Sequence, residues 1–460
     1  MQIDRTHKKH GCQINETVMA VRVRKAATTC LSMSLALLFQ RPAVADAVTD
    51  WNVNAGKAAL AACIAPGDDP LHESRLYAMM HVAIHDALNA IDRRSRPYAF
   101  DVQGNLGASR DAAVAAAARD VLVPVINQIP FPPACLQAAV ASVEADYAAA
   151  LAVVPNGMAK TQGIQIGQAS AIAILNLRAG DGSDTPLQDF GYPQGTNPGE
   201  YRDTPGFNFA FGPGWGRVTP FVLNHGSQFR PGPPFKVSSN KYSADFNEVK
   251  TFGGDGVHTP SARTPNQTEI ALFWLESSPL AWNRLARSVS ASRGLDLWEN
   301  ARLFGLLNLS MADGYIGSLD TKFHYNFWRP VTAIQTADTD GNPDTVGDPT
   351  WTPLQANYPN PDYDSAHSVE GGAAAEILKE FFGTDDISFR ACSLTLPPGS
   401  RCTDSSPVIR TYTSFSQAAE ENALSRILVG LHFRDATEEG VKHGRKIANH
   451  AANLFLRPVH

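Results

Sequence analysis

Apolar residues recur at helical spacing along most of this chain. In the stretch "RLYAMMHVAIHDALNAI" (residues 75–91), positions three and four apart fall on one side of a helix. That stripe consists of Leu76, Met80, Ala83, Ala87 and Ile91. The same periodicity predicts further helices over residues 109–125, 133–152, 158–179, 265–289, 296–320, 368–382, 415–431 and 437–455. The pattern therefore predicts a mainly α fold built from helical bundles.

One long segment breaks this pattern. Residues 183–262 are dominated by glycine, proline, asparagine and aromatic residues, as in "DFGYPQGTNPGEYRDTPGFNFAFGPGWGRVTPF", and show no periodicity. So long a stretch without regular structure is unusual inside a compact domain. Because it is rich in aromatic residues, we expect an ordered segment, called the wrap below, that covers the helical core or lines a site entrance.

These changes in composition divide the chain into three regions. Residues 1–47 form an N-terminal extension with a signal peptide, and residues 48–262 form a helical region that includes the wrap. Residues 263–460 form a C-terminal helical domain, which carries the candidate chemistry and is the predicted catalytic domain.

The first of these regions has the features of an export signal. Basic residues at 22, 24 and 25 precede an apolar run over 26–39 that is too short to span a bilayer. The "AVA" at 43–45 fits the small-x-small rule for cleavage, and the "ADA" at 45–47 is a second option. No other stretch is apolar enough for a membrane helix. We therefore expect a soluble protein without a membrane span, periplasmic or secreted.

Charge and cysteine content agree with export. The net charge is -6 and no basic stripe is visible, which argues against nucleic acid as a partner. Four cysteines follow the predicted cleavage site. Cys392 and Cys402 enclose the short loop "CSLTLPPGSRC", which a disulfide could close. Cys63 and Cys135 would then form a second disulfide or remain as buried free thiols.

Two patterns resemble metal sites but have simpler explanations. His81 and His85 lie four apart on a predicted helix without a third ligand at suitable spacing, so we interpret them as core histidines. The acidic residues of "DTDGNPDTVGDP" alternate like a calcium loop, but the glycine comes too early and no glutamate closes the loop. We expect a solvated turn there.

The strongest candidate chemistry lies in three segments of the C-terminal region. The first, "KFHYNFWRPVTAI", has Lys322 and Arg329 seven residues apart, with Tyr325, Phe327 and Trp328 between them. Taken alone, the two cations are best explained by aliphatic stems that lie over an aromatic surface. The alternative is that both bind an anion, with the aromatic residues as a dry pocket wall.

The other two segments also combine anion donors with a histidine. In "PDYDSAHSVEGG" a turn ends at Ser365, and the free N–H groups of the helix that follows, beginning with Ala366, favour an anion. His367 lies at this helix start and can exchange a proton. The third segment, "LSRILVGLHFRDA", places Arg426 and His432 six apart. Taken alone, each segment is better explained by an ordinary helix cap, a surface arginine and a core histidine.

Together the segments supply what a tetrahedral oxyanion requires. Guanidinium groups make bidentate contacts, an ammonium acts as a point charge, and neutral donors complete the set. The combined inventory is Lys322, Arg329, Ser365, the Ala366 N–H, Arg426, His367 and His432. One histidine could attack or ligate the central atom while the other moves protons.

The order "K-x6-R-P", "S-x-H", "S-R-x5-H" resembles the tripartite signature of the vanadium-dependent haloperoxidases and the type 2 phosphatidic acid phosphatase superfamily. The stretches "FWRPVTAI", "WGRVTPF" and "HVAIHDALNAI" look like the bacterial haloperoxidases, so the resemblance runs from about residue 50 to the C-terminus. It implies a helical-bundle haloperoxidase/acid-phosphatase-like fold with long irregular loops.

The resemblance also implies roles for these residues. In the haloperoxidases the residue that matches His432 is the axial ligand of vanadium, and the one that matches His367 is the acid–base residue. The vanadate oxygens would be held by Lys322, Arg329, Ser365, Ala366 and Arg426, and Lys322 would also polarise bound peroxide. The implied cofactor is orthovanadate, and the implied partners are hydrogen peroxide, a halide and a small organic substrate.

Two other functions use the same residues. In the related phosphatases the residue that matches His432 is the nucleophile that forms a phosphohistidine, so an acid phosphatase is the first alternative. A non-catalytic oxyanion-binding protein is the second. Asp364 and Ala366 stand where proline and glycine are usual, and a carboxylate that faced the site would weaken anion binding. Asn360 stands where haloperoxidases carry a residue thought to influence halide choice, so the halide cannot be deduced.

Overall fold

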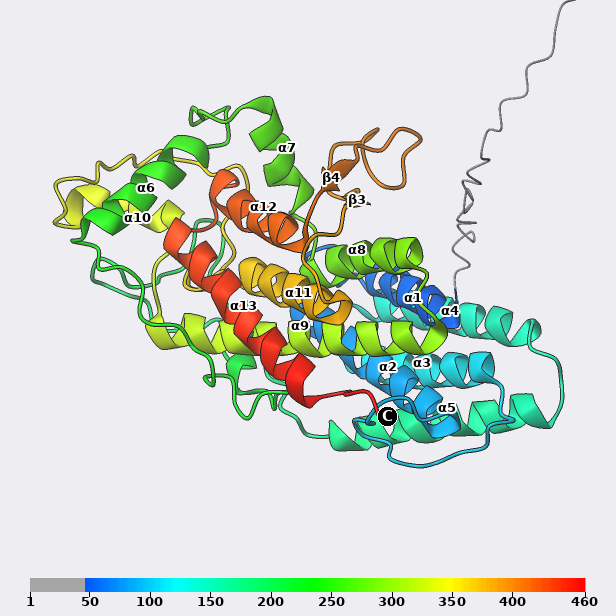
Figure 1. The fold of residues 1–460 in the computed structure, drawn as a ribbon. Coiled ribbons are helices and arrows are strands. Elements are labelled where there is room, and N and C mark those ends of the chain that lie inside the picture. The colour runs from blue at the N-terminus through cyan, green and yellow to red at the C-terminus, as the bar shows by residue number, and fades with distance from the viewer. Residues whose placement is uncertain (1–45, 460) are drawn as a thin grey trace, which may run out of the picture. The chain divides into compact units, whose positions relative to one another are not determined.

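The computed structural model describes residues 46–459, which belong to the compact unit Ala43–His460. The predicted signal peptide lies almost entirely outside the described residues. The predicted mainly α fold is confirmed, because the described residues form thirteen α-helices and two short two-stranded sheets (Figure 1). No helix among them is long and apolar enough to cross a membrane. The division of the chain at residue 262 stays a prediction.

The helices before and within the wrap are α1 (Ala47–Ala61), α2 (Pro70–Ile91), α3 (Arg110–Ile126), α4 (Pro133–Ala152), α5 (Met158–Leu177) and α6 (Asn240–Phe252). Those after it are α7 (Pro265–Phe273), α8 (Ser278–Arg293), α9 (Leu297–Tyr325), α10 (Pro330–Thr336), α11 (Ala366–Phe382), α12 (Phe415–Leu428) and α13 (Arg434–Leu454). The antiparallel strand pairs are β1 (Gln188–Asp189) with β2 (Ala210–Phe211) and β3 (Phe389–Ala391) with β4 (Arg410–Tyr412).

Local chemistry explains where the helices begin and end. Asp296 caps α9 by accepting hydrogen bonds from the backbone N–H groups of Trp298 and Glu299. The helix ends where Asn326 adopts a left-handed conformation, with φ of 52°. The single helix predicted over 265–289 is instead two, α7 and α8. Pro279, in the first turn of α8, cannot donate the hydrogen bond that would continue the preceding helix.

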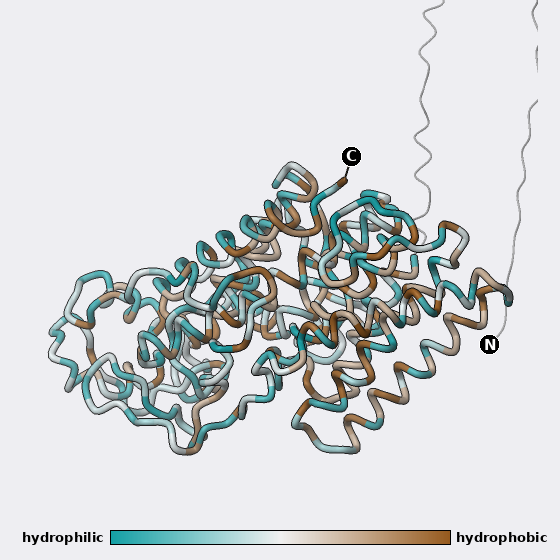
Figure 2. Tube along the Cα trace, turned by 90° about the horizontal axis from the view of Figure 1, so that it is seen from below, coloured by the Kyte–Doolittle hydropathy of each residue, from teal (hydrophilic) through white to brown (hydrophobic). Residues whose placement is uncertain are grey.

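Helices α2 and α9 form the centre of the core. All of α2 from Leu71 to Ile91 is buried, and so is most of the 29-residue α9. Helices α3 and α5 pack on α2, while α8, α11 and α13 pack on α9 (Figure 1). Figure 2 shows hydrophobic residues recurring along the packed helices and mostly hydrophilic residues in the connecting loops. Burial of these apolar faces is the main contribution to stability.

The backbones of α11 and α13 approach each other closely. A Cβ atom at Gly444 would lie 1.9 Å from the carbonyl oxygen of Val369, and one at Gly372 would lie 2.3 Å from that of Val441. Only glycine fits at such positions. This contact fixes α11, whose N-terminus carries part of the candidate site.

The wrap is ordered, as predicted, but it contains a helix that the sequence analysis missed. Helix α6 begins after Ser239, whose side chain accepts a hydrogen bond from the N–H of Tyr242. Tyr242, Phe246 and Val249 are buried at spacings of four and three, which is a helical pattern. Glycine- and proline-rich segments flank this helix on both sides, so its short helical pattern of apolar residues was not recognised in the sequence.

Other parts of the wrap lie against the candidate site. The N–H of Tyr201 donates to the carbonyl of Asn326 at 2.8 Å, and the N–H of Trp328 donates to that of Gly199 at 3.0 Å. The wrap therefore packs against the segment that follows α9.

Both expected disulfides are present. Cys63–Cys135 joins the turn after α1 to the start of α4, and Cys392–Cys402 closes the loop after β3. The alternative of buried free thiols at Cys63 and Cys135 is therefore wrong.

The patterns that resembled metal sites have structural roles. His81 is buried with its Nε2 2.7 Å from the amide nitrogen of Asn52, and Nδ1 of buried His85 lies 2.8 Å from Asp86. In the acidic turn, Asp340 accepts a hydrogen bond from the backbone N–H two residues later at 2.7 Å. The interpretations as core histidines and as a turn are confirmed.

Candidate active site

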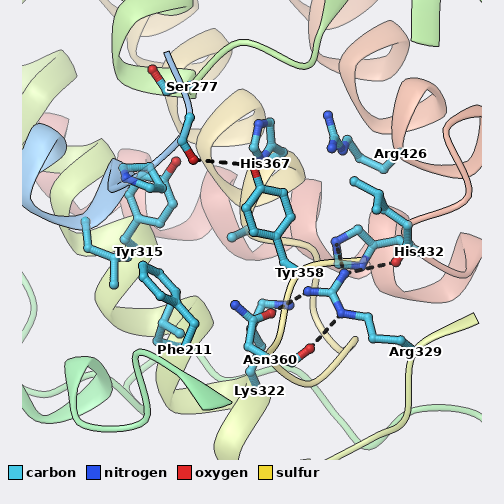
Figure 3. A pocket seen from close by; sticks show the side chains of 16 residues that line it. Phe211, Ser277, Tyr315, Lys322, Arg329, Tyr358, Asn360, His367, Arg426 and His432 are labelled. Atoms are coloured by element: carbon cyan, nitrogen blue, oxygen red, sulfur yellow. Dashed lines mark hydrogen bonds between the residues drawn. The ribbon is translucent and has the colours of Figure 1, made fainter. Parts of the chain in front are cut away.

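A small cavity lies where the end of α9, the start of α11 and the end of α12 meet (Figure 3). Its volume is about 50 Å³. It is lined by Gly67, Pro70, Leu71, Phe211, Ser277, Tyr315, Leu319, Lys322, Arg329, Tyr358, Asn360, Ala366, His367, Arg426, Leu431 and His432. All predicted site residues except Ser365 belong to this lining, and we call the space the cationic cavity.

Lys322 reaches the cationic cavity from the last turn of α9. Its ammonium donates to the carbonyls of Pro361 at 2.8 Å and Asp362 at 2.9 Å, and the residue is 1% exposed. Burial lowers the pKa of Lys322 well below its usual value, and the neighbouring Arg329 lowers it further. Two of its three N–H donors are thus used by neutral carbonyls.

Arg329 precedes α10 and is 2% exposed. Its Nε donates to the carbonyl of Asn360 at 2.7 Å, and its Nη1 donates to that of Leu431 at 2.9 Å. Its Nη2 also bonds to the side-chain oxygen of Asn360. The guanidinium thereby joins the segment before α11 to the turn after α12.

Arg426 lies in the last turn of α12 and is 1% exposed. Its Nη1 donates to the carbonyl of Trp274 at 2.6 Å, while its buried Nε has no partner among the residues that the structure describes. Burial lowers the pKa of Arg426 to about 10, so the guanidinium stays charged at neutral pH.

The three cations share one electrostatic feature. Within residues 46–459, no carboxylate oxygen lies within 4.0 Å of the nitrogen atoms of Lys322, Arg329 or Arg426. Buried charges are normally paired, because an unpaired charge in a dry environment is costly. Asp362 acts on Lys322 and Arg329 only from beyond this distance, so the cavity carries positive charge that a bound anion would compensate.

His432 lies beside these cations with a carboxylate behind it. Its Nδ1 is 2.8 Å from Oδ1 of Asp362, although the two groups are not aligned for a hydrogen bond. Its Nε2 is 3.0 Å from Nη1 of Arg329. Burial and the adjacent cations lower the pKa of His432 well below its usual value, and burial raises the pKa of Asp362 to about 7. The neutral imidazole with its proton on Nδ1 leaves the Nε2 lone pair unprotonated.

His367 lies in the first turn of α11, as the sequence predicts. Its Nε2 is 3.3 Å from the carbonyl of Glu276, and part of the ring remains exposed to the cavity. Burial and then Arg426 lower the pKa of His367 well below its usual value. A neutral histidine at this position can accept a proton from a ligand.

Ser365 and Asp364 are buried next to this helix start but do not line the cavity. The hydroxyl of Ser365 accepts a hydrogen bond from Ser368 at 3.0 Å, and its role as an anion donor stays a prediction. The carboxylate of Asp364 accepts a hydrogen bond from Ser318 at 2.8 Å and lies 2.7 Å from Nδ1 of His443. Asp364 therefore neither caps the helix nor faces the cationic cavity.

The aromatic residues between Lys322 and Arg329 do not form the pocket wall, contrary to the sequence-based expectation. Phe327 and Trp328 pack in a separate apolar cluster, with Tyr325 against it. Helix α9 ends at Tyr325, Asn326 adopts a left-handed conformation, and none of the three rings belongs to the cavity lining. The wall comes instead from Leu71, Phe211, Tyr315 and Tyr358. Figure 3 shows Phe211 and Tyr315 on the side opposite Arg426 and His432.

The sequence analysis missed these wall residues and Asp362. Leu71 and Phe211 lie more than 100 positions before Lys322, so no spacing rule connects them with the site. Asp362 had a weak signal, since it is a second carboxylate in the turn "PDYD", two residues before Asp364.

The geometry fits a tetrahedral oxyanion. Three buried cations, one unpartnered Nε–H and the N-terminus of α11 converge on a space large enough for a few waters or one small anion. His432 lines the same space, and its Nε2, 3.0 Å from Nη1 of Arg329, is a Lewis base.

Comparisons with known proteins give a consistent result. Residues 302–460 match the model of the second helical-bundle domain of VCPO. The vanadium chloroperoxidase of Curvularia inaequalis is 26% identical over 279 residues, which cover 48% of this chain. The match covers 45% of that protein, less than half of its length.

Two solved structures are similar in fold. A bacterial vanadium-dependent iodoperoxidase superposes with a TM-score of 0.72 at 23% identity, covering 88% of this chain and 95% of the other. A holo-type bacterial vanadium-dependent chloroperoxidase superposes with a TM-score of 0.63 at 16% identity, covering 84% and 91%.

Proposed function

We propose that this chain, a relative of the vanadium-dependent haloperoxidases, oxidises a halide with hydrogen peroxide to hypohalous acid, with vanadate as its prosthetic group. The observation that carries the proposal is the set of three buried cations in one cavity, Lys322, Arg329 and Arg426, which have no carboxylate within 4.0 Å in the described part of the chain. An anionic group compensates their charge. Vanadate, when bound, supplies a Lewis-acidic centre that activates peroxide.

The two histidines have different roles in this proposal. His432 offers Nε2 as a ligand to the central atom, and Asp362 behind it favours the tautomer with a proton on Nδ1. His367 moves protons. The net reaction, H2O2 + X⁻ + H⁺ → HOX + H2O, consumes one proton for each halide, so a neutral histidine that accepts and returns protons is required near the reacting oxygens.

The donors at the start of α11 complete the anion site. Ala366 lines the cavity as the first residue of α11, so its N–H, at the positive end of the helix dipole, would donate to the anion. We propose that Ser365, one residue earlier, adds its hydroxyl when the anion binds. Because Asp364 is engaged by Ser318 and His443, its carboxylate does not oppose the anion.

A phosphatase function is supported by the same histidine. A neutral imidazole with a carboxylate behind it also suits a nucleophile that attacks a phosphoryl group held by three cations. A non-catalytic oxyanion-binding protein would need only the cations. We rank the phosphatase and the binding protein below the haloperoxidase because the similar proteins described above are haloperoxidases.

We also propose that the protein is periplasmic or secreted. Two disulfides within the described residues support an oxidising compartment.

The function is tested with mature protein from residue 48, stripped of phosphate and assayed with and without orthovanadate. We expect vanadate-dependent bromination of an activated carbon acid by peroxide. The variant His432→Ala should lose at least about a hundredfold of this activity. The control His225→Ala, an exposed histidine of the wrap, should keep it. Hydrolysis of p-nitrophenyl phosphate that vanadate inhibits would instead identify a phosphatase, and silence in both assays would favour simple binding.

A further inference from the structure

A second, larger hollow adjoins the cationic cavity. Its volume is about 670 Å³, within the usual range of small-molecule sites. This outer cleft is lined by Pro66, Gly67, Asp68, Gln188, Phe207, Phe209, Phe211, Leu275, Gln355, Ala356, Tyr358, Pro359, Leu394, Thr395 and Arg401. Gly67, Phe211 and Tyr358 line both spaces and therefore form the partition between them.

One wall of the outer cleft is aromatic. The stretch "GFNFAFG" supplies Phe207, Phe209 and Phe211, the last of them from β2, and all three line the cleft. The rings of Phe207 and Phe209 are 5.7 Å apart and nearly perpendicular, at 87°. All three side chains are only partly buried. Together with Tyr358 they present a surface suited to a flat aromatic ring.

The lining of the outer cleft also carries a cation, Arg401, on a loop closed by a disulfide. Arg401 directly precedes Cys402, whose disulfide with Cys392 closes the loop, and Thr395 anchors that loop by donating to the carbonyl of Leu272 at 2.8 Å. The Nε of Arg401 donates to the carbonyl of Leu396 at 2.8 Å. In the described chain no carboxylate lies within 4.0 Å of its guanidinium.

The cleft also holds one acid. Asp68 is exposed and also lines a neighbouring hollow, so solvent screens its charge. The partly buried Arg401 is therefore the stronger charge for recognising a ligand within the cleft. A guanidinium with free terminal NH2 groups prefers a carboxylate.

We propose that the outer cleft binds an electron-rich aromatic carboxylate, a phenolic acid, with its carboxylate on Arg401 and its ring against Phe209 and the partition. The role of this acid as the acceptor of the halogen rests on the proposed function. Hypohalous acid that leaves the cationic cavity meets the ring at the partition. A carbon–halogen bond then forms, the O–X bond breaks, and the displaced ring proton leaves with the hydroxide as water: ArH + HOX → ArX + H2O.

Binding is tested without turnover, by calorimetry on the vanadate-free mature protein. The probe 4-hydroxyphenylacetate should bind. Tyramine, which carries the opposite charge, and cyclohexylacetate, which lacks the aromatic ring, should each bind at least about tenfold more weakly. Saturating orthovanadate should leave binding of the probe intact, because orthovanadate occupies the cationic cavity and not the outer cleft. Preference for tyramine, or loss of binding with orthovanadate, would overturn the proposal.

Variants assign the binding to the cleft. Arg401→Gln should weaken binding of 4-hydroxyphenylacetate about tenfold, since it removes one charged hydrogen-bonding group. Arg390→Gln is the matched control, because Arg390 is exposed on β3 and does not line the cleft. Phe209→Ala tests the aromatic wall. If this variant fails to fold, the comparison of Arg401→Gln with Arg390→Gln still tests the binding site. Equal effects of the two arginine variants would refute the assignment.

Turnover separates this proposal from the function on which it rests. Oxidation of iodide to triiodide needs no organic acceptor, so Arg401→Gln should leave it unchanged while the KM for 4-hydroxyphenylacetate rises about tenfold. If the wild-type protein oxidises no halide, the proposed function fails. The calorimetric measurements still test whether the outer cleft binds the aromatic carboxylate. An unchanged KM in Arg401→Gln would refute the acceptor site alone.

Discussion

Two groups of buried cations in this molecule differ in one respect. At the end of α5, Asp181 lies between Arg75 and Arg178, with N–O distances of 2.9 Å to each. Burial tends to raise the pKa of Asp181, but the two arginines and Ser183 hold it below its usual value. In the cationic cavity, three cations equally buried meet only carbonyls, amides and a histidine.

This difference separates structural from functional charge. A cation paired with a buried carboxylate is satisfied by the fold itself, and removing either partner leaves an unpaired charge. Cations held only by neutral acceptors have no charge partner in direct contact, and their charged form is costly until an anion arrives, as the lowered pKa of Lys322 reflects. The cavity is therefore expected to lower the stability of the empty protein and to recover that stability on binding.

The largest expected effect is at the paired group. Asp181→Ala leaves Arg75 and Arg178 facing each other without an anion, and we expect a loss of about 3–5 kcal/mol of unfolding free energy. Urea denaturation measures it. The control Asp101→Ala removes an exposed carboxylate and should change stability by less than about 1 kcal/mol. A small effect of Asp181→Ala would remove the distinction between the two groups.

Asp362→Asn should show a stability effect that depends on pH. The pKa of Asp362 is about 7 in the folded protein and near 3.8 when unfolded, so ionisation in the fold is unfavourable. The free-energy cost of ionising Asp362 in the folded protein is absent below pH 4, grows between pH 4 and 7, and is complete above pH 7. The variant should therefore gain stability over the wild type across that window, by up to about 4 kcal/mol. A pH-independent difference would contradict the assignment.

Anion binding should stabilise the wild type and not the cavity variants. At a hundred times its Kd, orthovanadate should add about 2.7 kcal/mol to the unfolding free energy. Arg329→Gln should lose most of this gain at the same concentration, because a charged bidentate donor is removed. Arg217→Gln, at an exposed position, is the control. Equal stabilisation of both variants, measured by thermal shift, would place the anion elsewhere.

The smallest effect has an unusual sign. Arg426→Met replaces an incompletely bonded buried cation with an apolar side chain of similar length, and we expect the anion-free protein to become more stable by about 1 kcal/mol. The matched variant Arg75→Met should be destabilised, because it breaks a pair. The sign of the difference is the test, and two losses of equal size would show that Arg426 is satisfied in the empty cavity.

Sequence reasoning found the charged residues of the site because helix ends and short loops keep them within a few positions of one another. Lys322 and Arg329, or Ser365 and His367, are linked by local geometry that spacing predicts. Most helices were found for the same reason, but α1, α6 and α10 were not predicted, and the last two are short and lie among glycine- and proline-rich segments or irregular turns.

What it missed depends on tertiary contacts. The partner of Asp364 is His443, 79 positions away, so the direction of its carboxylate could not be deduced from the turn alone. The apolar wall was assigned to Phe327 and Trp328, because nothing local revealed that these rings pack in a separate cluster beyond the end of α9. The wrap brings Phe211 to the cavity, and because the wrap shows no periodicity, its course could not be predicted from the sequence.

The carbonyl groups that hold the cations have a consequence for protein engineering. A fragment limited to residues 302–460 would contain Lys322, Arg329, Arg426 and both histidines. It would lack the carbonyls of Trp274 and Glu276, which position Arg426 and His367, and the wall contributed by Phe211. Transplanting the three motifs into another scaffold, or shuffling this domain alone between relatives, would therefore move the charges without the neutral backbone that makes them usable.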